Sequence, residues 1–299
     1  MKISTVLCLI LIPASAFLYL STCAKTVEIS FKPKIGDRIN SQTILDQTIF
    51  QTVQNKTFKS VQTIINKYTF TVKDIIEDTT VRIAVKIEEI SLTSETPAGK
   101  LSFSSKNGAW NNPEYAVLNK ITGKEFELFV TTTGEIKKIS GFDEILKSIL
   151  KDPTTVSPAL INTVKSLLNQ DAFKSAFSYL FDYYPGKTVK PGESWTREQK
   201  ASAFIPVTTR NLWALASVTG NQAVLKLSSG IKTENSLAAF EGKQEGEITV
   251  SLPSGWIKKG KIIQNLTGST ALPGAFKDNA KTSLKIQSTI NIKTSKINR

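Results

Sequence analysis

The sequence predicts a mainly β protein of the α+β type. Long antiparallel strands form one curved sheet or two related β halves, and a central helical segment packs on the sheet. Two observations lead to this fold class: apolar and polar residues alternate along several segments, and helical spacing replaces the alternation from about residue 142 to residue 184. A third observation bears on location, because the first 24 residues have the layout of an export signal. With 40% hydrophobic and 21% charged residues, the chain is typical of globular rather than disordered proteins.

The signal segment occupies residues 1–24. Lys2 precedes an apolar run from Val6 to Leu20, and the segment ends in Leu20-Ser21-Thr22-Cys23. This order gives the basic start, apolar stretch and small-residue exit of a secretory signal. The only other cysteine, Cys8, lies in the same segment, so the exported chain is expected to fold without a disulfide framework.

Three forms of the mature N-terminus follow from this segment. Cys23 is a candidate for lipidation at a bacterial lipobox, which would make the chain a lipoprotein. A signal peptidase would instead cut after Ala24 or Ala16, where small residues stand at the required positions. Retention of the apolar run from Ile3 to Leu20 as a membrane anchor is the third form, because its length approaches that of a spanning helix.

Alternation with a period of two identifies the strands. Branched apolar residues at 81, 83, 85 and 87 share one face, and Arg82, Lys86 and Glu88 lie on the other. Ile90 falls out of phase with the apolar face, which predicts a β-bulge or a strand end near Glu89. The same alternation marks residues 68–73 and 284–293. Strands with one apolar and one polar face are typical of antiparallel sheets.

The segment from 142 to 184 has helical spacing instead. A short helix begins near residue 142, a second opens at Ser157-Pro158, where serine is the N-cap and proline the first helical residue, and a third runs from about Gln170 to Tyr183. We favour packing on the sheet for the apolar stripe of the third helix. The alternative is that the stripe walls a ligand cavity, formed by Phe173, Phe177, Leu180 and Phe181.

The β regions on either side of this connector share two features. The segments 126–138 and 247–259 each read as a hairpin whose turn ends in glycine, Gly134 or Gly255, for which we expect a positive φ. Each region also opens with a glycine–acid pair before a strand. The predicted organisation is therefore a signal segment at 1–24, a β-rich half at 25–140, a helical connector at 141–185 and a second β-rich half at 186–299, with duplication of the halves left open.

Composition excludes several chemistries. The chain has no histidine, which rules out Ser-His-Asp and Cys-His nucleophile systems and histidine-ligated metals. We predict no enzyme, cofactor or metal site, although a carboxylate-based hydrolase stays open as a minor alternative. The formal net charge is +13, with the positive residues spread along the chain. This pattern fits solvated strand faces or an anionic envelope surface as partner, and not nucleic acid.

A motif near the start of the second half carries a resemblance. Residues 184–195 read aromatic-Pro-x-x-x-Val-x-x-Gly-acid-x-Trp, and with Gly246-Glu247-Ile248 and Gln264-Asn265-Leu266-Thr267-Gly268 they resemble a family of uncharacterised exported bacterial proteins of Bacteroidetes type, known as a domain of unknown function. The resemblance covers nearly the whole mature chain and implies export to a bacterial cell envelope. It supplies no catalytic residues, and its motifs are structural, so we expect Trp195 and Trp256 to pack against the core.

We therefore predict a non-enzymatic, membrane-associated protein of the bacterial cell envelope, either in the periplasm or as an outer-membrane lipoprotein. The first hypothesis is that it binds a lipid or another apolar or amphiphilic ligand between sheet and helices, with Phe173, Phe177, Leu180 and Phe181 in the cavity wall. The alternative is a structural or interaction protein with a filled core, which acts on glycan or envelope partners through its basic surface.

Overall fold

A computed structural model of the chain describes residues 26–106, 119–150, 174, 176–202, 206–233, 238–271 and 281–297. The signal segment with Cys23, the helix predicted to open at Ser157, and Phe173 lie outside these residues.

The described chain is mainly β. A twelve-stranded antiparallel sheet has the order β7-β6-β4-β3-β2-β14-β13-β12-β11-β10-β9, with β5 paired to β4, and β1 pairs with β8 apart from it. The strands are β1 (Val27–Glu28), β2 (Arg38–Val53), β3 (Lys56–Ile76), β4 (Thr80–Thr96), β5 (Gly99–Ser104), β6 (Glu125–Thr131), β7 (Ile136–Ser140), β8 (Thr188–Val189), β9 (Ser194–Ser202), β10 (Pro206–Thr219), β11 (Gln222–Thr233), β12 (Ala238–Ser251), β13 (Ile257–Ala271) and β14 (Lys281–Lys296).

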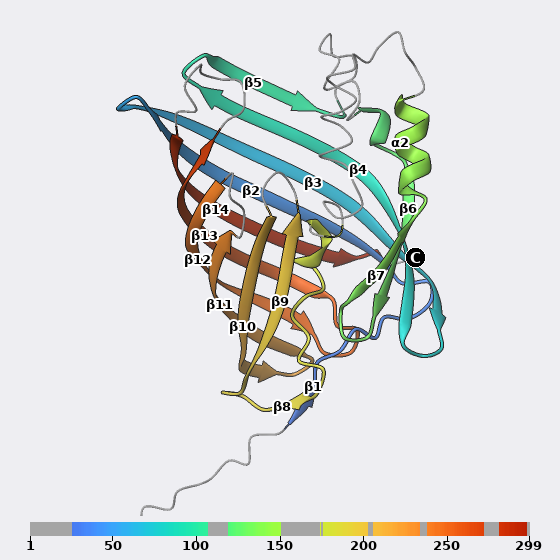
Figure 1. Cartoon of the computed structure of the whole chain (residues 1–299). Helices are drawn as coiled ribbons and strands as arrows, with labels where there is room; N and C mark the ends of the chain where they lie inside the picture. The colour runs from blue at the N-terminus through green and yellow to red at the C-terminus, as the bar shows by residue number, and fades with distance from the viewer. Residues whose placement is uncertain are drawn as a thin grey trace, which may run out of the picture.

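One continuous sheet, and not two separate ones, joins the two β-rich halves. Within this sheet the halves join through the pairing of β14 with β2, which runs from Ser283 opposite Thr52 to Lys296 opposite Ile39. The sheet is strongly curved (Figure 1), and we call its concave side the inner face and its convex side the outer face. On the long strands, apolar residues predominate on the inner face and charged residues on the outer face, although Ile44, Phe50 and Ile65 fall on the outer face.

The predicted bulge in β4 is confirmed. Lys67 of β3 lies opposite Glu89 and the next residue, Tyr68, lies opposite Ile87, so Glu88 is the additional residue of β4. The bulge restores the phase of the strand, because Ile90 and Ile87 then point to the same inner face.

The hairpin glycines also behave as predicted. Gly134 has φ 82° and Gly255 has φ 80°, in the region that side chains other than glycine rarely adopt. A Cβ atom at Gly255 would lie 2.4 Å from the carbonyl oxygen of Ser30, so the turn packs directly on the chain that enters the sheet. Both hairpin turns lie at the same end of the sheet as β1 and β8, which we call the closed end.

Two turns of the two halves have the same hydrogen bonds. In each of the turns 34–37 and 190–193, the N–H of the first residue donates to the acidic side chain of the last over 3.0 Å. In each, the glycine N–H donates to the adjacent strand, at the carbonyl of Val72 or of Leu215. A duplication of the halves predicts this equivalence, and common descent of the halves stays a prediction.

The central helical segment is shorter than predicted in the described residues. The helix α2 (Phe142–Leu150) is present. Phe142, Ile145 and Leu146 are buried, as expected for the apolar face of the predicted short helix. Of the helix predicted over 170–183, only residue 174 and the turn at 176–178 are described as helical, and residues 179–183 form turns. Central helices packed along the sheet are therefore not seen in the described part of the chain.

The reason for this difference lies in the hydrogen bonds of the backbone after Ser178. The indole N–H groups of Trp195 and Trp213 donate to the carbonyl oxygens of Tyr183 and Asp182, each over 3.0 Å. Within the segment, the N–H groups of Leu180 and Phe181 donate to carbonyl oxygens three residues back, and that of Tyr183 donates to Phe181. The regular four-residue spacing of helical hydrogen bonds is therefore lost, and the aromatic side chains of this segment reach the core from turns.

Candidate functional site

Three of the four residues predicted to wall a ligand cavity belong to the hydrophobic core at the closed end. Phe177 and Phe181 are 1% and 0% exposed and Leu180 is 6% exposed. The ring of Phe177 lies 5.0 Å from that of Tyr68 and 5.7 Å from that of Phe126. These side chains therefore fill space at the closed end, while Phe173 and Cys23 lie outside the described residues.

Trp195 and Trp256 pack against this core, as predicted. Both are nearly buried, and the ring of Trp256 lies 4.9 Å from Phe31 and 5.7 Å from Phe181 in centroid distance. The indole N–H of Trp195 has its acceptor in Tyr183, whereas that of Trp256 is buried without a hydrogen-bond partner in the described structure.

Two tyrosines connect the segment 177–184 to the turn between β12 and β13 by hydrogen bonds. The hydroxyl groups of Tyr183 and Tyr184 both donate to the carbonyl oxygen of Gly255, over 2.5 and 2.9 Å. Burial raises the pKa of both hydroxyls, so they stay protonated donors at neutral pH. Beside them, burial raises the pKa of Asp182, although the Arg197 guanidinium at 2.9 Å lowers it in part.

A row of polar side chains crosses the inner face at right angles to the strands. Its eight members lie directly opposite one another on eight consecutive strands from β10 to β4. We call this set the polar row; it consists of Asn211, Ser229, Gln244, Gln264, Ser288, Gln47, Gln62 and Ser94.

Hydrogen bonds connect most of the polar row. The Gln244 amide donates to the Asn211 side-chain oxygen over 2.7 Å and to the Ser229 hydroxyl over 3.1 Å, and it accepts from Gln264 over 2.7 Å. Gln264 also donates to the hydroxyl of Tyr179. Farther along, Gln47 donates to Ser288 and accepts from Gln62. Since Asn211, Ser229, Gln244 and Ser288 are buried, these bonds satisfy groups that would otherwise be costly to bury.

The polar row separates two apolar regions of the inner face. On one side lies the aromatic core of the closed end. On the other side, the next two cross-strand rows again place apolar side chains on the inner face. Ile231 and Phe240 of these rows are buried, but the others are only half-buried. We call the half-buried set the far apolar patch; it consists of Ile49, Leu266, Leu284 and Ile286.

The sequence analysis missed the polar row, although one signal for it was present. The alternation of apolar residues along β14 is broken at Ser288, and the same break occurs at Gln47 in β2. A polar residue at a position of the apolar face marks a place where the inner face needs a hydrogen bond. Whether such polar residues of different strands lie opposite one another depends on strand register, which a single sequence does not fix.

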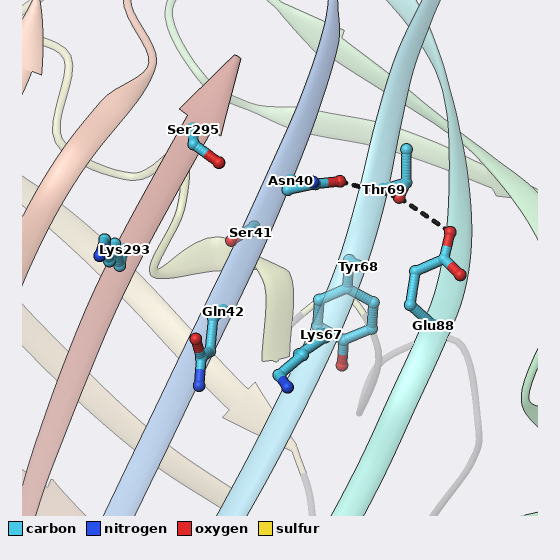
Figure 2. Close-up of a pocket in the computed structure, with 9 residues that line it drawn as sticks. All are labelled: Asn40, Ser41, Gln42, Lys67, Tyr68, Thr69, Glu88, Lys293 and Ser295. Atoms are coloured by element: carbon cyan, nitrogen blue, oxygen red, sulfur yellow. Dashed lines mark hydrogen bonds between the residues drawn. The ribbon is translucent and has the colours of Figure 1, made fainter. Parts of the chain in front are cut away.

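A separate polar pocket of about 470 Å³ lies on the outer face over β14, β2, β3 and β4 (Figure 2). The Thr69 hydroxyl lies 3.2 Å from the Asn40 oxygen and 2.8 Å from a Glu88 carboxylate oxygen. Lys67 and Lys293 also line it. The pocket therefore offers polar groups of both charges.

The carboxylates near this pocket do not fit the acid of a hydrolase. Burial acts to raise the pKa of Glu88, but hydrogen bonds from Thr69 and Lys86 lower it more, so the pKa lies below its usual value. Bonds from Lys67 and Lys106 likewise hold the pKa of Glu89 low. A general acid needs a raised pKa, so neither group suits that role.

Three further acidic residues lie at or beside the turn between β3 and β4. Asp74 lies 3.9 Å from Arg82, whereas Glu77 and Asp78 have positive φ angles in the exposed turn between β3 and β4. Among the described residues, no group of three or more His, Cys, Asp or Glu side chains is placed to hold a metal ion. Nor does any helix of the described part combine the length and hydropathy of a membrane span.

Residues 78–257 match a family described as "Family of unknown function (DUF6263)". No curated protein matches the chain. Among solved structures, the chain is similar to one titled for lipid–protein interactions in lipovitellin, with TM-score 0.45 and 9% identity over 90% of this chain. The alignment covers 26% of the lipovitellin chain, so this chain spans about a quarter of its length.

Two bacterial proteins are also similar. An outer membrane channel from Pseudomonas putida F1 has TM-score 0.24 and 5% identity, over 89% of this chain and 97% of its own. OccK7 of Pseudomonas aeruginosa has TM-score 0.23 and 5% identity, over 88% of this chain and 100% of its own. Overlap at this level, like that with lipovitellin, does not establish a shared fold and carries no argument about function.

Proposed function

The chain belongs to the DUF6263 family of unknown function, and we propose that it is an exported, non-enzymatic cell-envelope protein that holds the apolar part of an amphiphile on the inner face of its sheet. The observation that carries this proposal is the far apolar patch. Apolar side chains that a filled core would bury completely are only half-buried there, on the concave side of a strongly curved sheet.

The polar row gives the proposed site its second chemical feature. An amphiphile has an apolar chain and a polar group, and the inner face presents an apolar patch beside a line of amides and hydroxyls. In this arrangement the core with Phe177, Leu180 and Phe181 lies on the side of the polar row opposite to the far apolar patch. Export, through cleavage or through lipidation of Cys23, would bring the protein to the envelope, where such ligands are abundant.

Binding of a neutral apolar dye tests this proposal. N-phenyl-1-naphthylamine, whose fluorescence rises in apolar surroundings, should bind the wild-type protein saturably. Leu266→Gln places an amide in the far apolar patch and should weaken binding about tenfold, because burying an unpaired polar group costs on the order of 1–3 kcal/mol. Thr267→Gln makes the same addition one residue along β13, at an exposed position, and should leave binding unchanged. Equal binding by the two variants would rule out this site.

The packed aromatic core favours a second candidate, a structural or interaction protein that acts on glycan or envelope partners through its basic surface. The formal net charge of +13 would attract anionic envelope material. On this account, the dye would not bind saturably, and retention of the protein on isolated envelope material would fall steeply with added salt.

A further inference from the structure

A second pocket, at the closed end, is lined by several lysine side chains. It has a volume of about 470 Å³, within the range of small-ligand sites, and lies between the chain entering β2, the β12–β13 hairpin and the last residues of β14. Four lysines and one aspartate contribute to its lining: Lys32, Lys34, Lys258, Lys296 and Asp37.

The single aspartate of this pocket is already paired. Its carboxylate accepts from the Lys296 ammonium over 2.6 Å and from the backbone N–H of Lys34 over 3.0 Å. Burial acts to raise the pKa of Asp37, but these partners lower it more, so the pKa lies below its usual value and the group is ionised at neutral pH. Asp37 therefore pairs directly with Lys296, and the charge of Lys34 also helps to lower its pKa without a direct ion pair.

Two ammonium groups remain for a ligand. Lys32 pairs with Glu28 at 2.6 Å. In the described part of the chain, neither Lys34 nor Lys258 has an ion-pair partner, and both line the same pocket. Like charges gathered at one cavity repel each other, so folding gains nothing from this placement, whereas an anion between them would be stabilised.

The rest of the wall is apolar. Ile39, Pro253 and Trp256 line the pocket beside the lysines. Trp256 is 95% buried, and within the described residues its indole N–H has no hydrogen-bond partner, which is an uncommon cost for a native structure. A cationic rim beside an apolar wall suits an anion that carries an apolar substituent.

We propose that this pocket binds a single phosphate- or carboxylate-type anion between Lys34 and Lys258. The inference stands on the closed-end pocket and does not depend on the far apolar patch. The anion is either the head of a small amphiphile or a free ion.

Calorimetric titration of the mature protein with hexyl phosphate and with inorganic phosphate tests the proposal. Both lysines should contribute, so the double variant Lys34→Gln/Lys258→Gln should weaken binding about a hundredfold, since bonds between charged groups are among the strongest. Added salt should weaken binding by the wild type. Tighter binding of hexyl phosphate than of inorganic phosphate identifies an amphiphile head, and equal binding identifies a free ion.

Two lysines of the second β-rich half, Lys190 and Lys259, provide a matched control. Lys190 occupies the position of Lys34 in the equivalent turn, and Lys259 follows Lys258 without lining the pocket. The variant Lys190→Gln/Lys259→Gln removes the same charge and should bind as the wild type does. Absence of anion binding by the wild type, or equal weakening in both double variants, would overturn the proposal.

The dye experiment separates this inference from the proposed function. Leu266→Gln should leave binding of inorganic phosphate unchanged, and Lys34→Gln/Lys258→Gln should leave binding of the neutral dye unchanged. Each site can thus fail on its own.

Discussion

Replacement of Gln244 by methionine is expected to destabilise the protein by about 3 kcal/mol. Methionine has nearly the length and volume of glutamine, so the change removes hydrogen bonds without opening a cavity. Three bonds are lost: those to Asn211, to Ser229 and from Gln264. At about 1 kcal/mol net for each bond, the free energy of unfolding falls by about 3 kcal/mol.

The partners of Gln244 keep other bonds, which limits the loss to this value. The Asn211 oxygen still accepts from Ser229, and the Gln264 amide still donates to Tyr179. Urea unfolding followed by tryptophan fluorescence would measure the change. The control is Glu245→Met at the next, exposed position of β12, which should change stability by no more than about 0.5 kcal/mol. A loss below about 1 kcal/mol for Gln244→Met would refute the network.

Two further predictions concern the closed end. Gly255→Ala should lower the free energy of unfolding by several kcal/mol or prevent folding, because its Cβ would meet the Ser30 carbonyl at 2.4 Å. Gly192 also has a positive φ, 92°, but no atom lies within 4 Å of an added Cβ, so Gly192→Ala should cost only about 1 kcal/mol. Urea unfolding would measure both costs, and equal costs would contradict this packing. Asp182 has a folded pKa raised above 3.8, so folding takes up a proton and its contribution to stability falls as pH rises through the window from 3.8 to the folded pKa. The free energy of unfolding of the wild type minus that of Asp182→Asn should fall over this window in pH-dependent unfolding, and a rise would contradict the assignment.

Features that depend on neighbouring residues in the chain could be predicted from the sequence. The out-of-phase Ile90 predicted a bulge or a strand end near Glu89, and the structure has the bulge, with Glu88 as the additional residue. The positive φ angles of Gly134 and Gly255 followed from turn chemistry. The short helix at 142–150 followed from its stripe, since periodicity and burial are local properties.

Features that depend on distant partners could not be predicted. The segment after Ser178 has a helical pattern, yet Trp195 and Trp213 bond to its carbonyl oxygens and the chain forms turns. The polar row and the lysine pocket both join residues that are far apart in the sequence, such as Lys34 and Lys258. A single sequence identifies the two strands of a hairpin but not the pairing or register of strands far apart in the chain, so these sites emerge only from the sheet topology.

Native mass spectrometry of the mature protein, purified from its own host without harsh detergent, tests the central claim most directly. The account predicts a native mass above that of the denatured chain, with the excess lost on denaturation and reduced in Leu266→Gln but not in Thr267→Gln. A native mass equal to that of the denatured chain would contradict the proposal that the inner face holds an amphiphile.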